Sequence, residues 1–490
     1  MLVKILTARA GAVPFHSPRS ARRKKMSREK RRKGKSGKGT AKERRINIHL
    51  TPTVELIHKH LTEALCNEVF QGVRTTERER KWSLFGLARF WLAVILEPPP
   101  SLSKVLELTR RGDPRGLLPE VAASPEAFFQ KCKAFSSAFF MGLYTRFIEQ
   151  VEQHAPKQYC REVAHLQKRY SDVVIFDASR LDKIAHRLKI LWPEKAAVLP
   201  GCLLAVYDIF RGITTQLWFD ADAAASEFAR AMRAAECLGF GTLVMGDRLY
   251  CTIKLFRLLR EQNCFGLFRR NKSLSFKKIR RLRRLRMNGA MIEDWLVKAG
   301  AGKDAIELRL IRLKAGGKTY EAFTSDMDTK RLTAEDIVTL YPLRWRVERL
   351  FFDLKVVLKL ERFHAANPNA VAMQVFAGAM VHAAFRVAQA DIAKKLAVLP
   401  EELSTQKLFP LLALASIKVL EAEFIFEVTC RTNKRVKLRK PSWRVLPDTA
   451  VSLEYILLQH RSDVRKKRTF DPKRRNWKSF NKIRGGRKLT

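Results

Sequence analysis

The order of the short apolar segments between residues 172 and 268 constrains the fold more than any other feature of this chain. Three segments predict consecutive strands, with Arg211-Gly212 as a hairpin turn between the second and third, and helices then alternate with strands. In chain order the strands are 172–177, 202–210 and 213–219, followed by a helix at 223–238, a strand at 242–245, a helix at 252–262 and a strand at 264–268. This order predicts an α/β fold in which helices flank a mixed sheet.

The segments around this unit divide the chain further. Residues 46–160 have apolar residues at helical spacing, and we expect a helical, DNA-binding domain there, with helices at 53–73, 81–96 and 101–111. Ser124 is the expected N-cap of a long helix that begins at Pro125 and runs towards Gln153. Residues 366–460 are expected to form a C-terminal helical region.

The predicted core comprises residues 170–271 and 327–365, and residues 272–326 interrupt it. The interruption begins with a basic run and ends with a hairpin pattern, 306–313 and 319–325, around Gly316-Gly317. We therefore expect a basic, β-rich insertion between the two parts of the core.

Positive charge dominates the composition. The chain has 95 Lys and Arg against 48 Asp and Glu, a formal net charge of +47, yet 46% of its residues are hydrophobic and can build a core. The charge concentrates in a disordered basic arm (1–45), in the run 269–286 and in a basic tail (461–490). Three such runs favour contacts with nucleic-acid phosphates over a merely solubilising role. Met26 lies inside the arm and is an alternative start to Met1.

Membrane and secretory classes fit less well. The longest apolar runs, 84–96 and 371–385, are interrupted by polar residues and fall short of the roughly 20 residues that a membrane span needs. The eight cysteines have no metal-binding spacing, which is typical of reduced thiols. We expect a cytoplasmic protein with no membrane partner.

Acidic residues are few, so their positions carry information. Asp177 and Asp247 each close a predicted strand, where adjacent strand ends would bring their carboxylates together. A hard divalent cation would relieve the repulsion between them. Each aspartate could instead cap a turn, and four other acids compete for the role: Asp172, Asp182, Asp208 and Glu361.

The segment 341–355 brings a third carboxylate. On a helix, Arg344, Glu348 and Lys355 fall within about 60° of one another, and Tyr341 joins them if the turn at Pro342 stays helical. Taken alone, this pattern is also that of an exposed salt bridge. With the two aspartates, Glu348 would complete a set of oxygen ligands for two Mg²⁺ or Mn²⁺ ions, which activate a water or a 3′-hydroxyl for phosphoryl displacement.

These residues resemble the three catalytic boxes of DDE transposases of bacterial insertion sequences. The boxes are Asp177-Ala-Ser, Val244-Met-Gly-Asp247-Arg-Leu-Tyr and the spacing Y-x2-R-x3-E-x6-K from Tyr341 to Lys355, which is the signature of the insertion-sequence four group. The resemblance implies a ribonuclease-H-like core interrupted by a β-rich insertion. It implies metal binding by Asp177, Asp247 and Glu348, and phosphate contacts by Tyr341, Arg344 and Lys355.

The resulting hypothesis is a metal-dependent DNA transposase that cleaves and transfers strands at the ends of an insertion sequence in a bacterial cytoplasm, associated with the nucleoid. Its partner would be double-stranded DNA, bound by a homodimer on paired ends. Arg248 is a further candidate phosphate contact, with an ion pair as the equal alternative. Trp295 could stack on a flipped base, whereas Trp345 is expected to pack in the core or against its helix rather than to stack on a base. The alternatives are a catalytically silent, domesticated DNA-binding protein and an RNA-associated protein with basic tails.

Overall fold

The computed structural model describes most of the chain between residues 43 and 452. The described residues are 43–49, 56–57, 59–74, 80–113, 117–181, 201–222, 225–360, 363–364, 367–418, 425–431 and 448–452. The expectations for residues 1–42, including a start at Met26, and for the tail 461–490 lie outside them.

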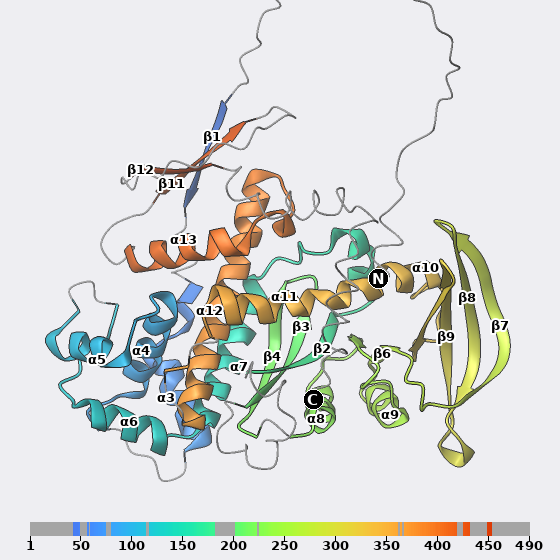
Figure 1. Cartoon of the computed structure of the whole chain (residues 1–490), viewed down its shortest axis with the longest axis horizontal. Coiled ribbons are helices and arrows are strands. Elements are labelled where there is room, and N and C mark those ends of the chain that lie inside the picture. The colour runs from blue at the N-terminus through green and yellow to red at the C-terminus, as the bar shows by residue number, and fades with distance from the viewer. Residues whose placement is uncertain are drawn as a thin grey trace, which may run out of the picture.

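A mixed sheet of nine strands forms the centre of the molecule (Figure 1). Its strand order is β4-β3-β2-β5-β6-β10-β9-β8-β7. The first strand of the predicted core, β2, pairs antiparallel with β3 and parallel with β5, which in turn pairs parallel with β6. These strands are β2 (Val173–Arg180), β3 (Cys202–Asp208), β4 (Ile213–Asp220), β5 (Leu243–Gly246) and β6 (Phe265–Arg269). The prediction of a mixed sheet flanked by helices is confirmed.

Strand β2 continues past the point where the sequence pattern ends it. We expected Asp177 to close the strand, but β2 runs on to Arg180 because Ala178, Ser179 and Arg180 still pair with β3. Asp177 therefore lies within the strand, opposite Ala205, and its side chain direction is fixed by the pleat. Asp247 directly follows β5, as expected.

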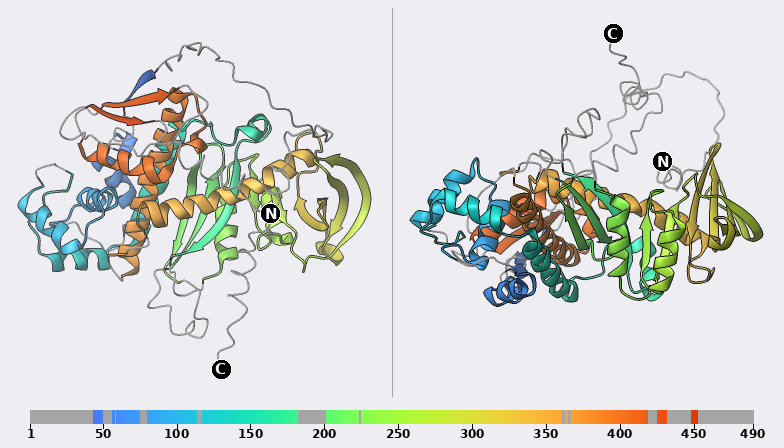
Figure 2. Two further views of the ribbon diagram at one scale, coloured as in Figure 1. Left: turned by 45° about the horizontal axis from the view of Figure 1, so that its top comes forward. Right: turned by 90° about the horizontal axis from the view of Figure 1, so that it is seen from below.

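The segment 272–326 extends the same sheet. Strand β10 pairs antiparallel with β6, and β9, β8 and β7 follow outward, so the basic run forms most of the edge strand. Figure 2 shows these strands curving away at one end of the molecule, opposite the N-terminal helices. Their bounds are β7 (Phe276–Met287), β8 (Ala290–Ala299), β9 (Ile306–Ala315) and β10 (Lys318–Thr324).

Two hydrophobic cores cover the two faces of the sheet. In β2, Val174 and Phe176 face the core beneath α8 (Glu227–Glu236) and α9 (Ile253–Glu261), whereas Val173 and Ile175 face the opposite core. This alternation follows from the two-residue period of a strand. The opposite core also holds α10 (Ala334–Leu340), α11 (Arg346–Phe352) and all the N-terminal helices.

The described residues between 59 and 168 are largely helical. Ser124 caps α6 at Pro125 as predicted, but the expected long helix is two helices, because Ser136 accepts a bond from Ala138 and caps a new one. The segment comprises α3 (Glu63–Val73), α4 (Leu84–Leu96), α5 (Leu102–Arg111), α6 (Pro125–Ala134), α7 (Ser137–His154) and the short helix η1 (Arg161–Lys168).

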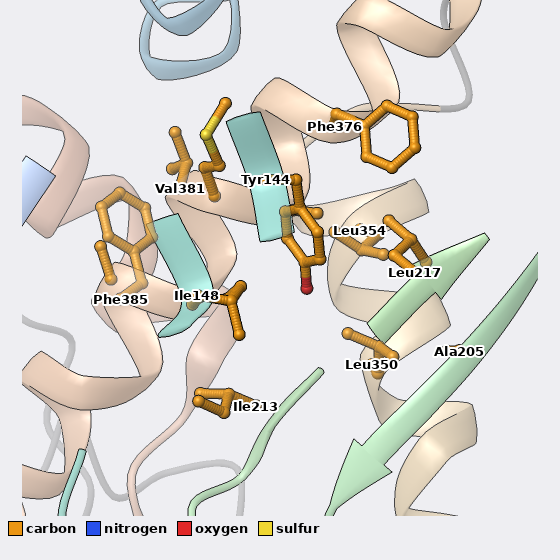
Figure 3. Close-up of a cluster of buried hydrophobic side chains, with 14 of the residues drawn as sticks. Tyr144, Ile148, Ala205, Ile213, Leu217, Leu350, Leu354, Phe376, Val381 and Phe385 are labelled. Carbon is orange, nitrogen blue, oxygen red and sulfur yellow. The ribbon is translucent and has the colours of Figure 1, made fainter. Parts of the chain in front are cut away.

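A long helix, α12 (Pro368–Leu396), passes through the middle of the core. Among the described helices it is the one long and apolar enough to cross a membrane, and its apolar window is wholly buried inside the protein. Figure 3 shows its Phe376, Val381 and Phe385 near Tyr144 of α7 and Leu350 of α11. Helix α12 therefore joins the N-terminal helices to the layer that carries α11.

The expectation of helix throughout 366–460 is wrong for its C-terminal part. Helix α13 (Thr405–Lys418) is followed by β11 (Ile425–Arg431) and β12 (Asp448–Ser452). Strand β11 pairs with β1 (Glu43–His49), so residues 43–45 belong to a strand and not to the basic arm, and 46–49 are not helical. The sequence of β11, Ile-Phe-Glu-Val-Thr-Cys-Arg, is rich in β-branched and aromatic residues, which favour a strand.

Candidate active site

The signature segment is a broken helix. Thr333 and Asp336 form a capping box that starts α10, and a 3₁₀ turn, η4 (Tyr341–Trp345), follows it. Pro342 has no N–H to donate, which accounts for the change of helix type there. After α11 the chain widens into a π-helical turn, η5 (Asp353–Val357).

Tyr341 fixes this segment to the second aspartate box. Its hydroxyl donates to the carbonyl oxygen of Gly246 at 3.1 Å, one residue before Asp247. Gly246 has no room for a side chain, because a Cβ there would lie 2.6 Å from the Tyr250 ring. Burial raises the pKa of Tyr341 to about 12, so its hydroxyl stays protonated and keeps donating. Tyr341 therefore has a partner within the protein.

The two aspartates are electrostatically coupled. Burial raises the pKa of Asp177 to about 7; nearby Arg344 opposes this rise, and the negative charges of Glu227 and Asp247 add to it. Asp247 is half-buried and accepts a hydrogen bond of 2.6 Å from the backbone N–H of Leu249. Repulsion between close carboxylates is the condition that a cation relieves.

Arg344 acts electrostatically on two of the acidic residues. Burial raises the pKa of both Asp177 and Glu348, and the positive charge of Arg344 opposes both rises. Glu348 itself has an exposed side chain on α11. The charge of Arg344 thus favours the ionised form of one carboxylate on β2 and of one on α11.

Lys355 ties the π-helical turn to the first aspartate box. Its Nζ atom donates to the Ser179 hydroxyl at 2.5 Å, two residues after Asp177. Since Ser179 and Asp177 alternate with Ala178, both face the same side of the sheet. The π turn places Lys355 over β2, although it is seven residues beyond Glu348.

The carboxylates of the candidate site are chemically suited to a hard divalent cation, because carboxylate oxygens are the ligands that Mg²⁺ and Mn²⁺ prefer. Within the described residues, no three Asp, Glu, His or Cys side chains converge closely enough to hold an ion. The crowding of negative charge around Asp177 is the observation that fits such an ion.

A cavity of about 580 Å³ adjoins Asp247. Strands β9 and β10 form one wall, α10 and η4 the other, and Arg248, Arg269 and Arg344 line it. Trp345 also lines it and is 51% exposed, so this ring does not pack in the core, which was one of its two expected placements. The 3₁₀ turn rotates it outward, where the Arg344 guanidinium lies 4.6 Å from its centroid.

Trp295 lies on the other side of the insertion strands. It pairs in register with Leu310, whereas the cavity is lined by the next residue, Ile311. Lys278 lies 4.2 Å from the Trp295 ring centroid and Arg281 5.7 Å.

The competing acids fall outside this region or outside the described residues. Asp172 and Asp208 share the guanidinium of Arg211 at the start of β2, and Lys157 also pairs with Asp172. Asp208 is opposite Val174, three residues before Asp177. Asp182 and Glu361 are not among the described residues.

Sequence reasoning missed two residues here. Tyr250, within the second box, donates to Glu227 at 2.5 Å, and Glu227 is among the charges around Asp177. The available signal was the position of Glu227 in the first turn of the helix between the third and fourth core strands.

These features define an α/β protein in which acidic and basic side chains gather at one edge of the sheet. Enzymes of phosphoryl transfer use the same combination of side chains. Comparison with known proteins shows which family part of the chain resembles. Residues 203–383 match the family described as "Transposase DDE domain". This stretch includes Asp247 and the whole Tyr341-to-Lys355 signature, and Asp177 precedes it. The stretch 203–383 is thus similar to a transposase DDE domain, and the resemblance predicted from the sequence is confirmed.

Two relatives agree with this assignment. A protein of Sinorhizobium fredii described as the transposase y4zB is 30% identical over 155 residues, which are 30% of this chain and 43% of the relative. A protein of Synechocystis sp. described as a transposase for insertion sequence element IS4SA is 26% identical over 173 residues, 34% of this chain and 44% of the relative. The matches thus span less than half of each relative's length.

Proposed function

We propose that the protein is a DNA transposase that cleaves and transfers strands at the ends of an insertion sequence, with a ribonuclease-H-like catalytic core. The observation that carries this proposal is a pair of hydrogen bonds by which the signature segment contacts both aspartate boxes. Tyr341 donates to the carbonyl oxygen of Gly246 beside Asp247, and Lys355 donates to Ser179, two residues after Asp177. A salt bridge on an isolated surface helix would not account for the contacts with β2 and β5.

Asp177, Asp247 and Glu348 are the proposed ligands of two divalent cations, Mg²⁺ or Mn²⁺. Such ions supply positive charge that stabilises the transferring phosphoryl group. In the first step a water oxygen bonds to phosphorus, and the 3′ oxygen at the element end leaves with a proton. The freed 3′-hydroxyl then attacks phosphorus in target DNA and displaces a 3′ oxygen. Excision by cut-and-paste also needs cleavage of the opposite strand, and water is again the reactant consumed.

The basic side chains of the site would bind the DNA backbone. Arg344 lines the cavity beside Asp247, and Arg248 is exposed at its rim. Both can reach a phosphate close to the carboxylates, and a guanidinium can bind it with two hydrogen bonds. Tyr341 and Lys355 already bond to Gly246 and Ser179, so their first contribution is to position the two aspartate boxes.

The proposed partner is double-stranded DNA, contacted also by β7. This strand carries seven Lys and Arg, all exposed, at the free edge of the sheet. Among the described residues, Arg283 alone of these seven forms an ion pair, with Glu335. Charge that is not neutralised within the protein can contact phosphates. We further propose a homodimer on paired ends and a nucleoid-associated, cytoplasmic location.

The test is cleavage of a DNA duplex that carries the element's own ends, in Mg²⁺ or Mn²⁺. We expect Glu348→Gln to reduce nicking at least about 10³-fold while DNA binding persists, since the variant removes one charge at the site. Glu335→Gln, at the start of α10, is the matched control and should nick normally. Retained cleavage by Glu348→Gln would refute the site assignment.

The same assay separates the alternative of a silent, DNA-binding protein. Such a protein would bind the duplex in a salt-sensitive manner. Neither the wild-type protein nor Glu348→Gln would nick the duplex, whether Mg²⁺ or Mn²⁺ is present. Inverted repeats on both sides of the gene, bounded by short direct repeats, would independently support a mobile element.

A further inference from the structure

The N-terminus of α8 lies at the edge of the sheet that carries the candidate site. Strands β2 and β4 are both antiparallel to β3 and therefore run in the same direction. The chain leaves β4 at the edge towards which β2 carries Asp177. Ser226 accepts a bond from Ala229 and caps α8 there, so Glu227 is the first residue of the helix.

Tyr250 holds the Glu227 carboxylate in place. Its hydroxyl donates to Oε1 of Glu227 at 2.5 Å, and its side chain is fully buried. The Tyr250 ring packs against Phe176, with centroids 6.1 Å apart, and occupies the space beside Gly246. The ring thus touches the residue before Asp177 and the residue before Asp247. A phenol clamped at these two points fixes Glu227 relative to both aspartates.

A glutamate in the first turn of a helix is ordinarily explained by the helix dipole, which is worth about 0.3–1 kcal/mol. That explanation accounts for an acid at this position but not for the buried donor. A buried hydroxyl must be hydrogen-bonded, and bonding it to the Glu227 carboxylate holds a negative charge at the sheet edge that carries Asp177 and Asp247, where like charges repel. A site that receives a cation would offset this cost.

We propose that Glu227 is a fourth acidic residue of the active site and that Tyr250 positions its carboxylate towards the cation held by Asp177 and Asp247. This inference rests on the proposed function. Glu227 comes from the helix layer opposite α11, so the acids would surround the reacting phosphate from both layers. Tyr250 acts through Glu227 and is a positioning residue.

The test measures Mn²⁺ binding to the full chain without DNA, by the electron paramagnetic resonance signal of free Mn²⁺. Glu227→Gln keeps the shape of the side chain and can still accept the bond from Tyr250, but it removes the charge. We expect it to weaken Mn²⁺ binding about 10-fold, with Tm within about 2 °C of wild type. Tyr250→Phe should weaken binding less, because the charge stays but its position is no longer fixed.

The control is Glu236→Gln, the same substitution at an exposed position at the other end of α8. It should bind Mn²⁺ like wild type. Unchanged Mn²⁺ affinity in Glu227→Gln overturns the inference, also when its Tm falls, since the residue is then structural. If Glu227→Gln does not fold, unchanged affinity in Tyr250→Phe overturns it. Asp177→Asn separates the two proposals: if it also binds Mn²⁺ normally, the proposed metal site itself fails.

Discussion

At the scale of single residues, the site depends on side chains that serve two boxes at once. Arg344 acts on carboxylates of β2 and α11, and the Tyr341 hydroxyl connects η4 to the end of β5. Lys355 likewise connects η5 to β2 through its hydrogen bond to Ser179. Removing one of them should therefore disturb the relative position of two elements as well as a proposed contact with DNA.

Asp177 gives a prediction at this scale, on stability in the absence of metal. Its pKa is raised by burial from 3.8 to about 7, so its contribution to stability is present below about pH 4 and is lost as pH rises through 7. Between pH 4.5 and 8, Asp177→Asn should gain stability relative to wild type by on the order of 2 kcal/mol, after allowance for solvent screening.

Urea unfolding in EDTA at the two pH values measures this difference. Asp304→Asn, at an exposed position in the 3₁₀ turn after β8, is the control and should show no such change with pH. A constant difference between Asp177→Asn and wild type at both pH values would contradict the prediction.

At the scale of elements, β7 is unusual because this edge strand has exposed Lys and Arg side chains on both of its faces. Two irregularities in its pairing with β8, at Lys278/Arg280 and Arg281/Arg283, shift the register. As a result, Lys278 and Arg281 flank Trp295, while Arg283 reaches Glu335 on the opposite side. Charge on an edge also prevents pairing with another sheet, which would otherwise lead to aggregation.

The prediction for β7 concerns the salt dependence of DNA binding. Replacing Arg280 and Arg286 by Gln should weaken binding to any duplex and reduce the slope of log K against log salt by about 2, since each phosphate contact contributes about 0.9. Fluorescence anisotropy over a salt series measures it. The double variant Lys394→Gln/Lys395→Gln in the last turn of α12 removes the same charge from exposed positions elsewhere. Equal slopes in both double variants would refute a contact specific to β7.

At the scale of the whole molecule, α12 joins parts that are distant in the sequence. The buried Arg386 guanidinium donates to Gly212 in the β3–β4 turn and to Gln389, and it lies 4.2 Å from the Tyr159 ring centroid. The same core encloses the N-terminal helices and one face of the sheet. The described helices and the sheet should therefore unfold together.

Phe376→Ala tests this cooperativity. Phe376 is buried on α12 against Tyr144 of α7, at 5.9 Å between ring centroids, and its loss should cost about 3–5 kcal/mol. Hydrogen exchange should then lose protection in peptides of both α4 and β3. Leu414→Ala on α13, which removes an exposed side chain, is the control. Loss of protection in α4 alone would show that the N-terminal helices form a separate unit.

The sequence by itself determined the residues of the candidate site and the order of the core elements, because strand ends, helix caps and the Tyr341-to-Lys355 spacing are local patterns. Only the tertiary structure decided that Asp177 lies inside a strand, that the basic run is a sheet edge and that Trp345 is exposed. It also revealed Glu227 and the pairing of β1 with β11. These features depend on partners distant in the sequence, and a local pattern does not encode which partner an element meets.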